Sequence, residues 1–370
     1  DSIEVRGIAD FETGTFVFTN IQTTVATDST GGNSGDITLA ANSILVKDAG
    51  QIQTVTNGAG NAGNIMMTAN QNIDITTALV QSLAQPTFDA EGNIATRSSG
   101  NTGNITMTSA HGDMSIVNRS TITSQTVESP GTVGAIAMNA PEGSILMTDA
   151  TFFTYIQPPV NSSGVRAARV QGSGEVQINA RNMQMNGSSM EVINLSVKPA
   201  GDLIVTLAGT LSLGPGSFGP SHIQAASSEL LDGSRGGAPS AGLNVRAHDI
   251  VITDDASIST DTVGSGAAGP LNISMINLQL TNGGKISSNS RQAVDSNGTP
   301  LAPPPSGRAG NITIQGLASS AQSVQIDGTG SGIFTKTEGT GAGGSTNIST
   351  QSLTIQNGGS ISAATSRTAS

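Results

Sequence analysis

The chain has 370 residues and a formal net charge of −11, with 15 Lys and Arg against 26 Asp and Glu. This acidic balance disfavours nucleic-acid binding, and the absence of Cys excludes both a disulfide framework and a thiolate metal site. Aromatic residues make up only 2% of the chain while Gly reaches 47 residues, a composition that disfavours a globular enzyme core and suits stacked coils with small and branched side chains inside.

A short anchor recurs about ten times along the chain: a Gly, a polar residue and then alternating aliphatic residues. The clearest copies begin at Gly35, Gly63, Gly103 and Gly310. Variant copies begin at Gly134, Gly174, Gly201, Gly242, Gly269 and Gly344. Strict alternation is typical of a strand with one buried face, so each anchor predicts a first short strand.

A second alternating run follows most anchors, then a turn, then a third strand. The second runs are Ile44–Val46, Ile73–Ile75, Met114–Ile116, Ile145–Met147, Met183–Met185, Leu211–Leu213, Ile250–Ile252, Leu278–Leu280, Val324–Ile326 and Leu353–Ile355. Turn residues such as Asp48-Ala49-Gly50 and Asn282-Gly283-Gly284 come next. Third strands are expected around Ile52, Ile122, Ile258, Ile286 and Ile361.

Three short strands per repeat without a helix signal predict an all-β, single-stranded parallel β-helix of about ten coils, with no helical cap. Right-handed coiling is expected from the general handedness of parallel crossovers. A β-propeller is the alternative, but it needs antiparallel blades and usually aromatic positions. We expect residues 1–30 to form an incomplete first coil, in which residues 2–5 are a second strand, and residues 31–370 to form continuous coils.

Short and long coils alternate, and the extra residues fall mainly between a third strand and the next anchor. The predicted long loops cover about 83–102, 156–173, 225–241 and 290–309. Because stacked strands lie roughly 4.8 Å apart, a loop on every second coil has about twice the room of a loop on each coil. We expect these loops to lie on one edge, over a sheet face or projecting for contacts.

Carboxylates and histidines are the residues that would indicate catalysis in a β-helix. Asp254 and Asp255, followed by Asp261, are the best candidate cluster of catalytic carboxylates. However, Asp254 and Asp255 fall in a turn, where Asp supports the local backbone geometry. The histidines His111, His222 and His248 lie far apart in the sequence, so surface roles are favoured over a shared metal site. We therefore expect no catalytic, cofactor-binding or metal site and no bound cofactor.

Two further patterns have simpler structural interpretations. Residues 31–36 resemble calcium-binding nonapeptides but do not recur every nine residues, and residues 282–286 lack the Ser or Thr of a phosphate loop. Asn64, Asn104 and Asn311 follow anchor glycines, where Asn tolerates left-handed backbone and can hydrogen-bond along a stack. These asparagines are interpreted as scaffold residues.

The repeats resemble those of filamentous-haemagglutinin-like exoproteins of the two-partner secretion type, in their cyanobacterial-like form. The resemblance rests on Gly310–Ile314, Ser352–Ser362 and the glycine-rich Gly339–Gly344, and it extends over residues 31–370. It implies a right-handed β-helical rod that is exported through an outer-membrane transporter and acts as an adhesin, filament or stalk. The secretion domain of that family, with its Asn-Pro-Asn type motif, is not present in this sequence.

These patterns lead to three expected functions. The first is a non-enzymatic structural or adhesive segment of a large secreted bacterial surface protein, at the cell surface or in a biofilm matrix. The second is a self-stacking subunit of an extracellular fibre, matrix or sheath, and the third is a polysaccharide-active enzyme. Expected partners are neighbouring coils of a longer chain or identical subunits stacked end to end, with a cell-surface or polysaccharide ligand, no nucleic acid and no membrane span.

Overall fold

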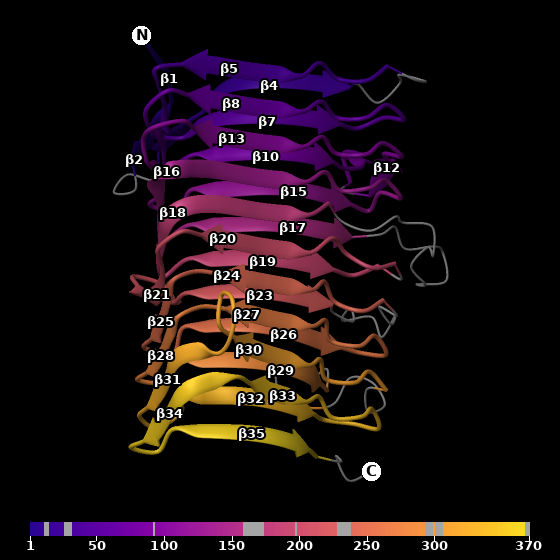
Figure 1. Ribbon diagram of the computed structural model, residues 1–370. Coiled ribbons are helices and arrows are strands. Elements are labelled where there is room, and N and C mark those ends of the chain that lie inside the picture. Colours follow the sequence, from indigo (N-terminus) through magenta and orange to yellow (C-terminus); the bar gives the residue numbers. More distant parts are fainter. Residues whose placement is uncertain are drawn as a thin grey trace. The chain divides into compact units, whose positions relative to one another are not determined.

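The structure is a computed structural model of residues 1–370, and it describes residues 1–10, 15–25, 32–91, 93–157, 174–196, 198–227, 238–292, 299 and 306–366. These residues form two compact units, unit 1 from Asp1 to Arg181 and unit 2 from Asn182 to Ser370. Each unit is built from three rows of short parallel strands (Figure 1). The part of the chain that the structure describes contains no helix, and thus no helix able to cross a membrane.

Unit 1 stacks its strands in register within each row. The first row holds β5 (Ile37–Ala41), β8 (Ile65–Ala69), β13 (Ile105–Ser109) and the start of β16 (Ile136–Thr148). The second row holds β1 (Ser2–Arg6), β6 (Ser43–Lys47), β9 (Ile73–Thr76), β14 (Met114–Val117) and the end of β16. The third row holds β4 (Thr19–Val25), β7 (Gly50–Thr56), β10 (Leu79–Ala84), β15 (Thr121–Val127) and β17 (Thr151–Gln157).

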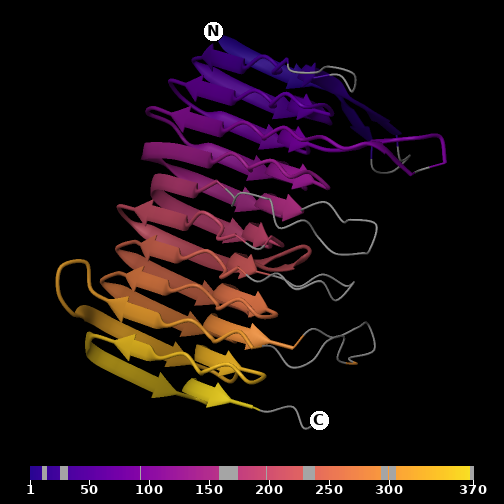
Figure 2. The same ribbon diagram turned by 90° about the vertical axis from the view of Figure 1, so that its right-hand side faces the viewer.

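Unit 2 repeats the same arrangement (Figure 2). Its first row holds β20 (Leu203–Leu207), β24 (Leu243–Arg246), β27 (Leu271–Ser274), β30 (Ile312–Gln315) and β33 (Thr346–Ile348). Its second row holds the end of β18 (Val176–Asn186), β21 (Thr210–Gly216), β25 (Asp249–Thr253), β28 (Asn277–Thr281), β31 (Ala321–Asp327) and β34 (Thr350–Gln356). Its third row holds β19 (Ser189–Asn194), β23 (His222–Ser227), β26 (Ser257–Val263), β29 (Lys285–Arg291), β32 (Gly332–Thr337) and β35 (Ser360–Thr365).

These rows confirm the predicted all-β parallel β-helix with three short strands per coil. Strand β1 pairs with β6, so residues 2–5 form the expected second strand. A propeller is excluded as an interpretation because every pair within the three rows is parallel. The antiparallel pairs that the structure describes are small and lie outside those ladders: β2 (Ile8–Asp10) with β3 (Thr15–Val17), β11 (Thr87–Phe88) with β12 (Ile94–Thr96), and β22 (Gly219–Pro220) with the end of β21.

The core follows the predicted alternation in the first two rows. In β6, for example, Ile44 and Val46 are fully buried while their neighbours are partly exposed. The third row differs, because only its first inward position is regularly hydrophobic and the next ones often carry hydroxyls. In β7 the inward residues are Ile52, Thr54 and Thr56, all fully buried. One corner of each coil is therefore lined by buried polar groups.

The turn between the second and third strands depends on left-handed backbone. Asp48 and Ala49 have φ values of 53° and 69°, and Asp254 and Asp255 have φ values of 54° and 62°. The corresponding turn at Asn282 and Gly283 also has positive φ. Asp, Asn and Gly tolerate this region best, so the predicted turn residues are in place.

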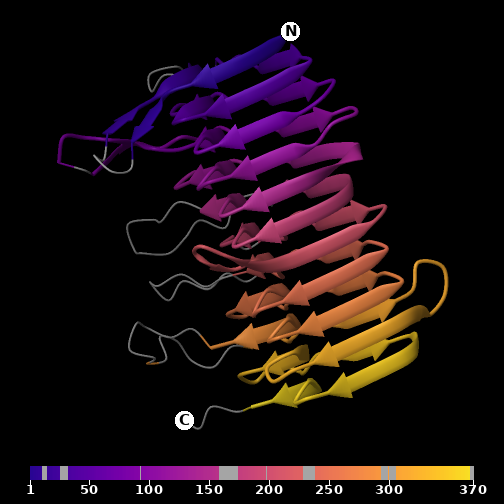
Figure 3. The ribbon, with the colours of Figure 1, turned by 90° about the vertical axis from the view of Figure 1, so that its left-hand side faces the viewer.

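Only parts of the predicted long loops fall within the residues that the structure describes. The segment 83–102 carries the small β11–β12 hairpin shown in Figure 3. The central parts of the predicted loops 156–173, 225–241 and 290–309 lie outside the described residues.

Candidate functional site

Two glycines, three residues apart, form the corner where each coil of unit 1 enters its first strand. The pairs are Gly60 with Gly63, Gly100 with Gly103, and Gly131 with Gly134. A Cβ atom added at any of these positions would collide with the carbonyl oxygen of the matching glycine in the preceding coil. The repeat anchor predicted from the sequence contains only the second glycine of each pair. The G-x-x-G spacing itself was the signal for the first.

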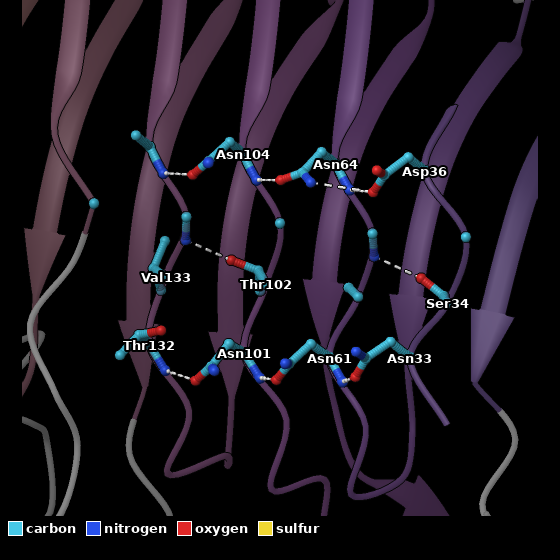
Figure 4. Close-up of a pocket in the computed structure, with 17 residues that line it drawn as sticks. Asn33, Ser34, Asp36, Asn61, Asn64, Asn101, Thr102, Asn104, Thr132 and Val133 are labelled. Atoms are coloured by element: carbon cyan, nitrogen blue, oxygen red, sulfur yellow. Dashed lines mark hydrogen bonds between the residues drawn. The ribbon is translucent and has the colours of Figure 1, made fainter. Parts of the chain in front are cut away.

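These corners line a polar groove of about 720 Å³ in unit 1 (Figure 4). We call it the asparagine corner; it comprises residues 33–36, 61–64, 101–104 and 132–135, with Gly174 beside them. The glycines keep the backbones close, and Asn, Ser and Thr side chains rise between them.

Side-chain carbonyls of the asparagine corner bind the backbone of the next coil. In one row, the Asn104 amide N–H donates to the Asn64 Oδ1 atom over 2.9 Å, and Ala135 N–H donates to Asn104 Oδ1 over 2.8 Å. In a second row, Asn101 N–H donates to Asn61 Oδ1 over 3.0 Å, and Thr132 N–H donates to Asn101 Oδ1 over 2.7 Å. Figure 4 shows both rows running along the stack.

Buried hydroxyls bind the glycine backbone between these rows. Gly103 N–H donates to the Ser82 hydroxyl over 2.8 Å, and Gly134 N–H donates to the Thr102 hydroxyl over 2.7 Å. The corner of unit 2 uses the same device: Gly269 N–H donates to Ser240 over 2.7 Å. These three glycine N–H groups are thereby satisfied by side chains of the protein and need no water.

The predicted hydrogen bonds of Asn64, Asn104 and Asn311 along the stack are confirmed by these contacts. Asn311 Oδ1 accepts from Ser345 N–H over 3.1 Å, matching the two asparagines of unit 1. The expectation of left-handed backbone is wrong for all three, since none has a positive φ. These asparagines stabilise the stack through the side-chain Oδ1 atom, which accepts a hydrogen bond from the next coil, and not through the backbone geometry of a turn.

A second polar region lies on the outer face of the third row in unit 2. Asp261, in β26, points outward, yet its side chain is only 7% exposed. Its carboxylate accepts from Gln224 Nε2 over 3.0 Å, from Asn289 Nδ2 over 3.0 Å and from Arg291 Nη2 over 3.1 Å. Burial raises the pKa of Asp261, although the bonds from Arg291, Asn289 and Gln224 oppose that shift.

The structure brings only two of the three carboxylates that the sequence singled out, Asp255 and Asp261, to one groove. Asp254 accepts from Asn282 Nδ2 over 3.3 Å, and Asp255 pairs with Lys285 over 2.9 Å. Asp255 and Asp261 line one groove of about 300 Å³, but Asp254 is not among its lining residues. Asp254 therefore has a structural role in the turn between the second and third strands.

Each of the three histidines pairs with a different nearby carboxylate. His111 lies 2.8 Å from Glu142, His222 lies 2.6 Å from Glu191, and His248 lies 3.0 Å from Asp249. Their side chains are 38–56% exposed, as surface roles require. Within the described ranges, no three His, Cys, Asp or Glu side chains gather as a metal site would need.

No family model, no curated protein and no solved structure matches the chain.

Proposed function

We propose that this chain is a non-enzymatic structural and adhesive β-helix segment of a large secreted bacterial surface protein. The observation that carries the proposal is the use made of the polar side chains in unit 1. Amides and hydroxyls that could serve a catalytic site are bound to the backbone of the neighbouring coil instead, as in the Asn64, Asn104 and Ala135 row. Such bonds hold coils together and favour a rigid scaffold over a reaction centre.

The pairing of charged groups supports the same proposal. Histidines and carboxylates meet one another across the surface at hydrogen-bond distance, and the best catalytic candidate, Asp254, is held in a turn. The composition agrees with an extracellular scaffold, because a chain without Cys does not depend on the redox state of its surroundings. The resemblance of the repeats to haemagglutinin-like exoproteins supports a surface location.

Antibodies against the purified chain test the location. They should label intact, non-permeabilised cells of the source organism, and the labelled chain should bind those cells saturably. Labelling that requires permeabilisation would overturn the proposal. A second assay measures reducing ends and unsaturated uronates released from neutral and acidic polysaccharides; release that disappears in Asp261→Asn would establish the polysaccharide-active enzyme instead.

A self-stacking fibre subunit is the second candidate, because rows of strands that pair in parallel along one axis can also pair with a second copy of the chain. In β34, Leu353 and Ile355 are 46% and 44% exposed. Their partners in the preceding coil, Val324 and Ile326, occupy the same rows and are buried. A second copy stacked on β34 would cover these side chains in the way that successive coils cover each other, as would a further coil of a longer chain, so the two proposals are separated by experiment.

Sedimentation over a wide range of protein concentrations tests the fibre. Self-stacking predicts growing assemblies that Ile355→Asp suppresses, whereas the matched change Leu146→Asp, at an outward leucine that is 37% exposed, leaves them intact. Wild-type chain that stays monomeric at high concentration, with no filaments in micrographs, would contradict self-stacking.

A further inference from the structure

We infer that the outer face of the third row in unit 2 is a binding site for a neutral, hydroxyl-rich glycan. We call it the Asp261 face; its central residues are His222, Gln224, Ser257, Ser259, Asp261 and Ser287, which line a groove of about 300 Å³. The inference rests on the adhesive part of the proposed function and names the ligand class for it.

Strand register places the polar groups of the Asp261 face in a grid. Gln224 pairs with Ser259, which pairs with Ser287 in the following coil. Asp261 in turn pairs with Asn289. Neighbouring strands lie roughly 4.8 Å apart, and alternate residues along a strand roughly 6.6 Å apart. Hydroxyl and amide groups repeated at these spacings match the dense hydroxyls of a saccharide.

The buried carboxylate of Asp261 fixes the donors around it. Gln224, Asn289 and Arg291 each donate to it over 3.0–3.1 Å, and Asn289 N–H adds a bond of 3.2 Å. Burying a charge contributes little to stability even when it is paired. Holding three flexible side chains in one arrangement instead lowers the entropy that a ligand must remove on binding. The network is therefore better explained as preorganisation.

Hydroxyls beside that network have no hydrogen-bond partner in the described part of the chain, although Ser259 and Ser287 are only 5% and 8% exposed. Among the described residues, the side chains of Ser257, Ser259 and Ser287 make no hydrogen bond. The inward hydroxyls of the same strands behave differently, since Thr260 Oγ1 lies 2.8 Å from both the Gly269 carbonyl oxygen and the Ser288 hydroxyl. The outward row thus offers hydrogen-bonding groups that the fold itself does not use.

The charges of the Asp261 face are balanced, which decides between neutral and acidic glycans. Lys285 pairs with Asp255 over 2.9 Å and Arg291 pairs with Asp261 over 3.1 Å. Because Lys285 and Arg291 are both paired with carboxylates of the protein, neither is free to bind a uronate or a sulfate. The chain as a whole carries a net charge of −11. Long-range repulsion therefore disfavours polyanions.

An aromatic side chain flanks the grid. Phe334 pairs in register with Ser287, and its ring lies over Gly332 on the same strand, where any Cβ would collide with it. An aromatic ring next to a few fixed polar groups is the usual composition of a small-ligand site. The ring would contact the apolar face of a sugar while Ser287 and Asn289 bind its hydroxyls.

Native gel electrophoresis through soluble polysaccharides tests the site on the full chain. Galactomannan, xyloglucan and dextran are the neutral probes, and polygalacturonate is the acidic one. We expect at least one neutral polymer to retard the wild-type chain and polygalacturonate to have no effect. Ser287→Leu, which fills the groove from an outward strand position, should weaken that binding at least tenfold.

Matched variants separate binding from folding. Ser212→Leu makes the same change at an outward position of β21 in the second row and should bind as wild type does. Phe334→Ala should weaken binding, whereas Phe334→Tyr, which keeps an aromatic ring, should bind as the wild-type chain does. If the ring only covered Gly332 and did not contact the sugar, neither change would alter glycan binding in a folded variant. Circular dichroism confirms that each variant is folded.

The outcomes distinguish this inference from the proposed function. No retardation by any neutral polymer, stronger retardation by polygalacturonate, or unchanged binding by folded Ser287→Leu overturns the glycan site. Cell binding that persists in Ser287→Leu leaves the adhesive function standing without this site, whereas wild-type chain that binds no cells removes the adhesive function itself.

Discussion

The asparagine corner of unit 1 and the Asp261 face of unit 2 are both rich in amides and hydroxyls, but they use them differently. At the corner, side-chain carbonyls of Asn61, Asn64, Asn101 and Asn104 accept from the backbone of the next coil. On the Asp261 face, polar side chains bind one another, and serine hydroxyls beside them have no partner among the described residues. The polar groups of the asparagine corner therefore stabilise the fold, and the smaller groove of the Asp261 face is the better candidate for a ligand site.

This difference teaches that the number of polar groups in a groove does not by itself indicate a binding site. What matters is whether the acceptors and donors are already committed to the fold. Substitutions at the corner should change stability, and substitutions on the outer face should change binding more than stability.

The largest effect is expected from a methyl group at a stacked glycine. Gly103→Ala should lower the free energy of unfolding by about 3 kcal/mol or more, because its Cβ would meet the Gly63 carbonyl oxygen of the preceding coil. Urea denaturation measures the change. Gly35→Ala is the matched control, since its Cβ would meet only Thr23 Cγ2 at 3.8 Å and should cost far less. Equal losses in both variants would refute steric stacking as the reason for these glycines.

Buried hydroxyls of the third row should divide into two groups. Thr260→Val should lower the free energy of unfolding by about 2 kcal/mol, because Thr260 Oγ1 lies 2.8 Å from the Gly269 carbonyl oxygen. Thr154→Val should raise it by about 1 kcal/mol, because the buried Thr154 hydroxyl has no protein partner among the described residues. Thermal and urea unfolding of both variants check the pair. The same sign in both would contradict the role assigned to Thr260.

A smaller loss is expected in the asparagine rows. Asn104→Ala removes the acceptor that lies 2.8 Å from Ala135 N and should lower the free energy of unfolding by about 1 kcal/mol. Asn104→Asp keeps an acceptor and should retain most of the stability, as Asp36 does for Asn64 at 2.7 Å. If alanine and aspartate were equally harmful, the hydrogen bond along the stack would not be the stabilising feature.

The smallest effect concerns pH. The pKa of Asp261 is higher in the folded chain than in the unfolded one, so the folded state binds its proton more tightly. Stability should then fall as pH rises from about 4, the unfolded value, through the folded pKa. The slope stays below the single-proton limit of about 1.4 kcal/mol per pH unit. Asp261→Asn should remove this component, which urea titrations across that pH range measure; identical pH profiles would contradict the raised pKa.

The coils could be predicted from the sequence because their signals are local. Alternating aliphatic residues such as Ile44 and Val46 give a strand with one buried face, and Asn282-Gly283 gives the left-handed turn that follows. The buried threonines of the third row were not predicted. Period-two alternation distinguishes inward from outward residues by hydrophobicity, so a Thr that points inward to bind the backbone is not recognised.

The Asp261 network could not be predicted because its members are distant in the sequence. Gln224 and Asp261 are 37 residues apart, whereas Asp261 and Asn289 are 28 residues apart. Which residues meet on the face depends on the length of each intervening loop, and coil lengths vary. Only the register of β23, β26 and β29 brings these side chains together.

The stacked glycines also determine where such a chain can change length during evolution. Between Gly60 and Gly63 a single added residue would turn the strand that follows, β8, so that its inward residues face outward, and the carbonyl contacts of the corner leave no space to absorb it. Segments that precede the corner, such as the one bearing the β11–β12 hairpin, grow without disturbing that alignment. We expect insertions and deletions among homologous chains to concentrate there, and duplication to proceed by whole coils.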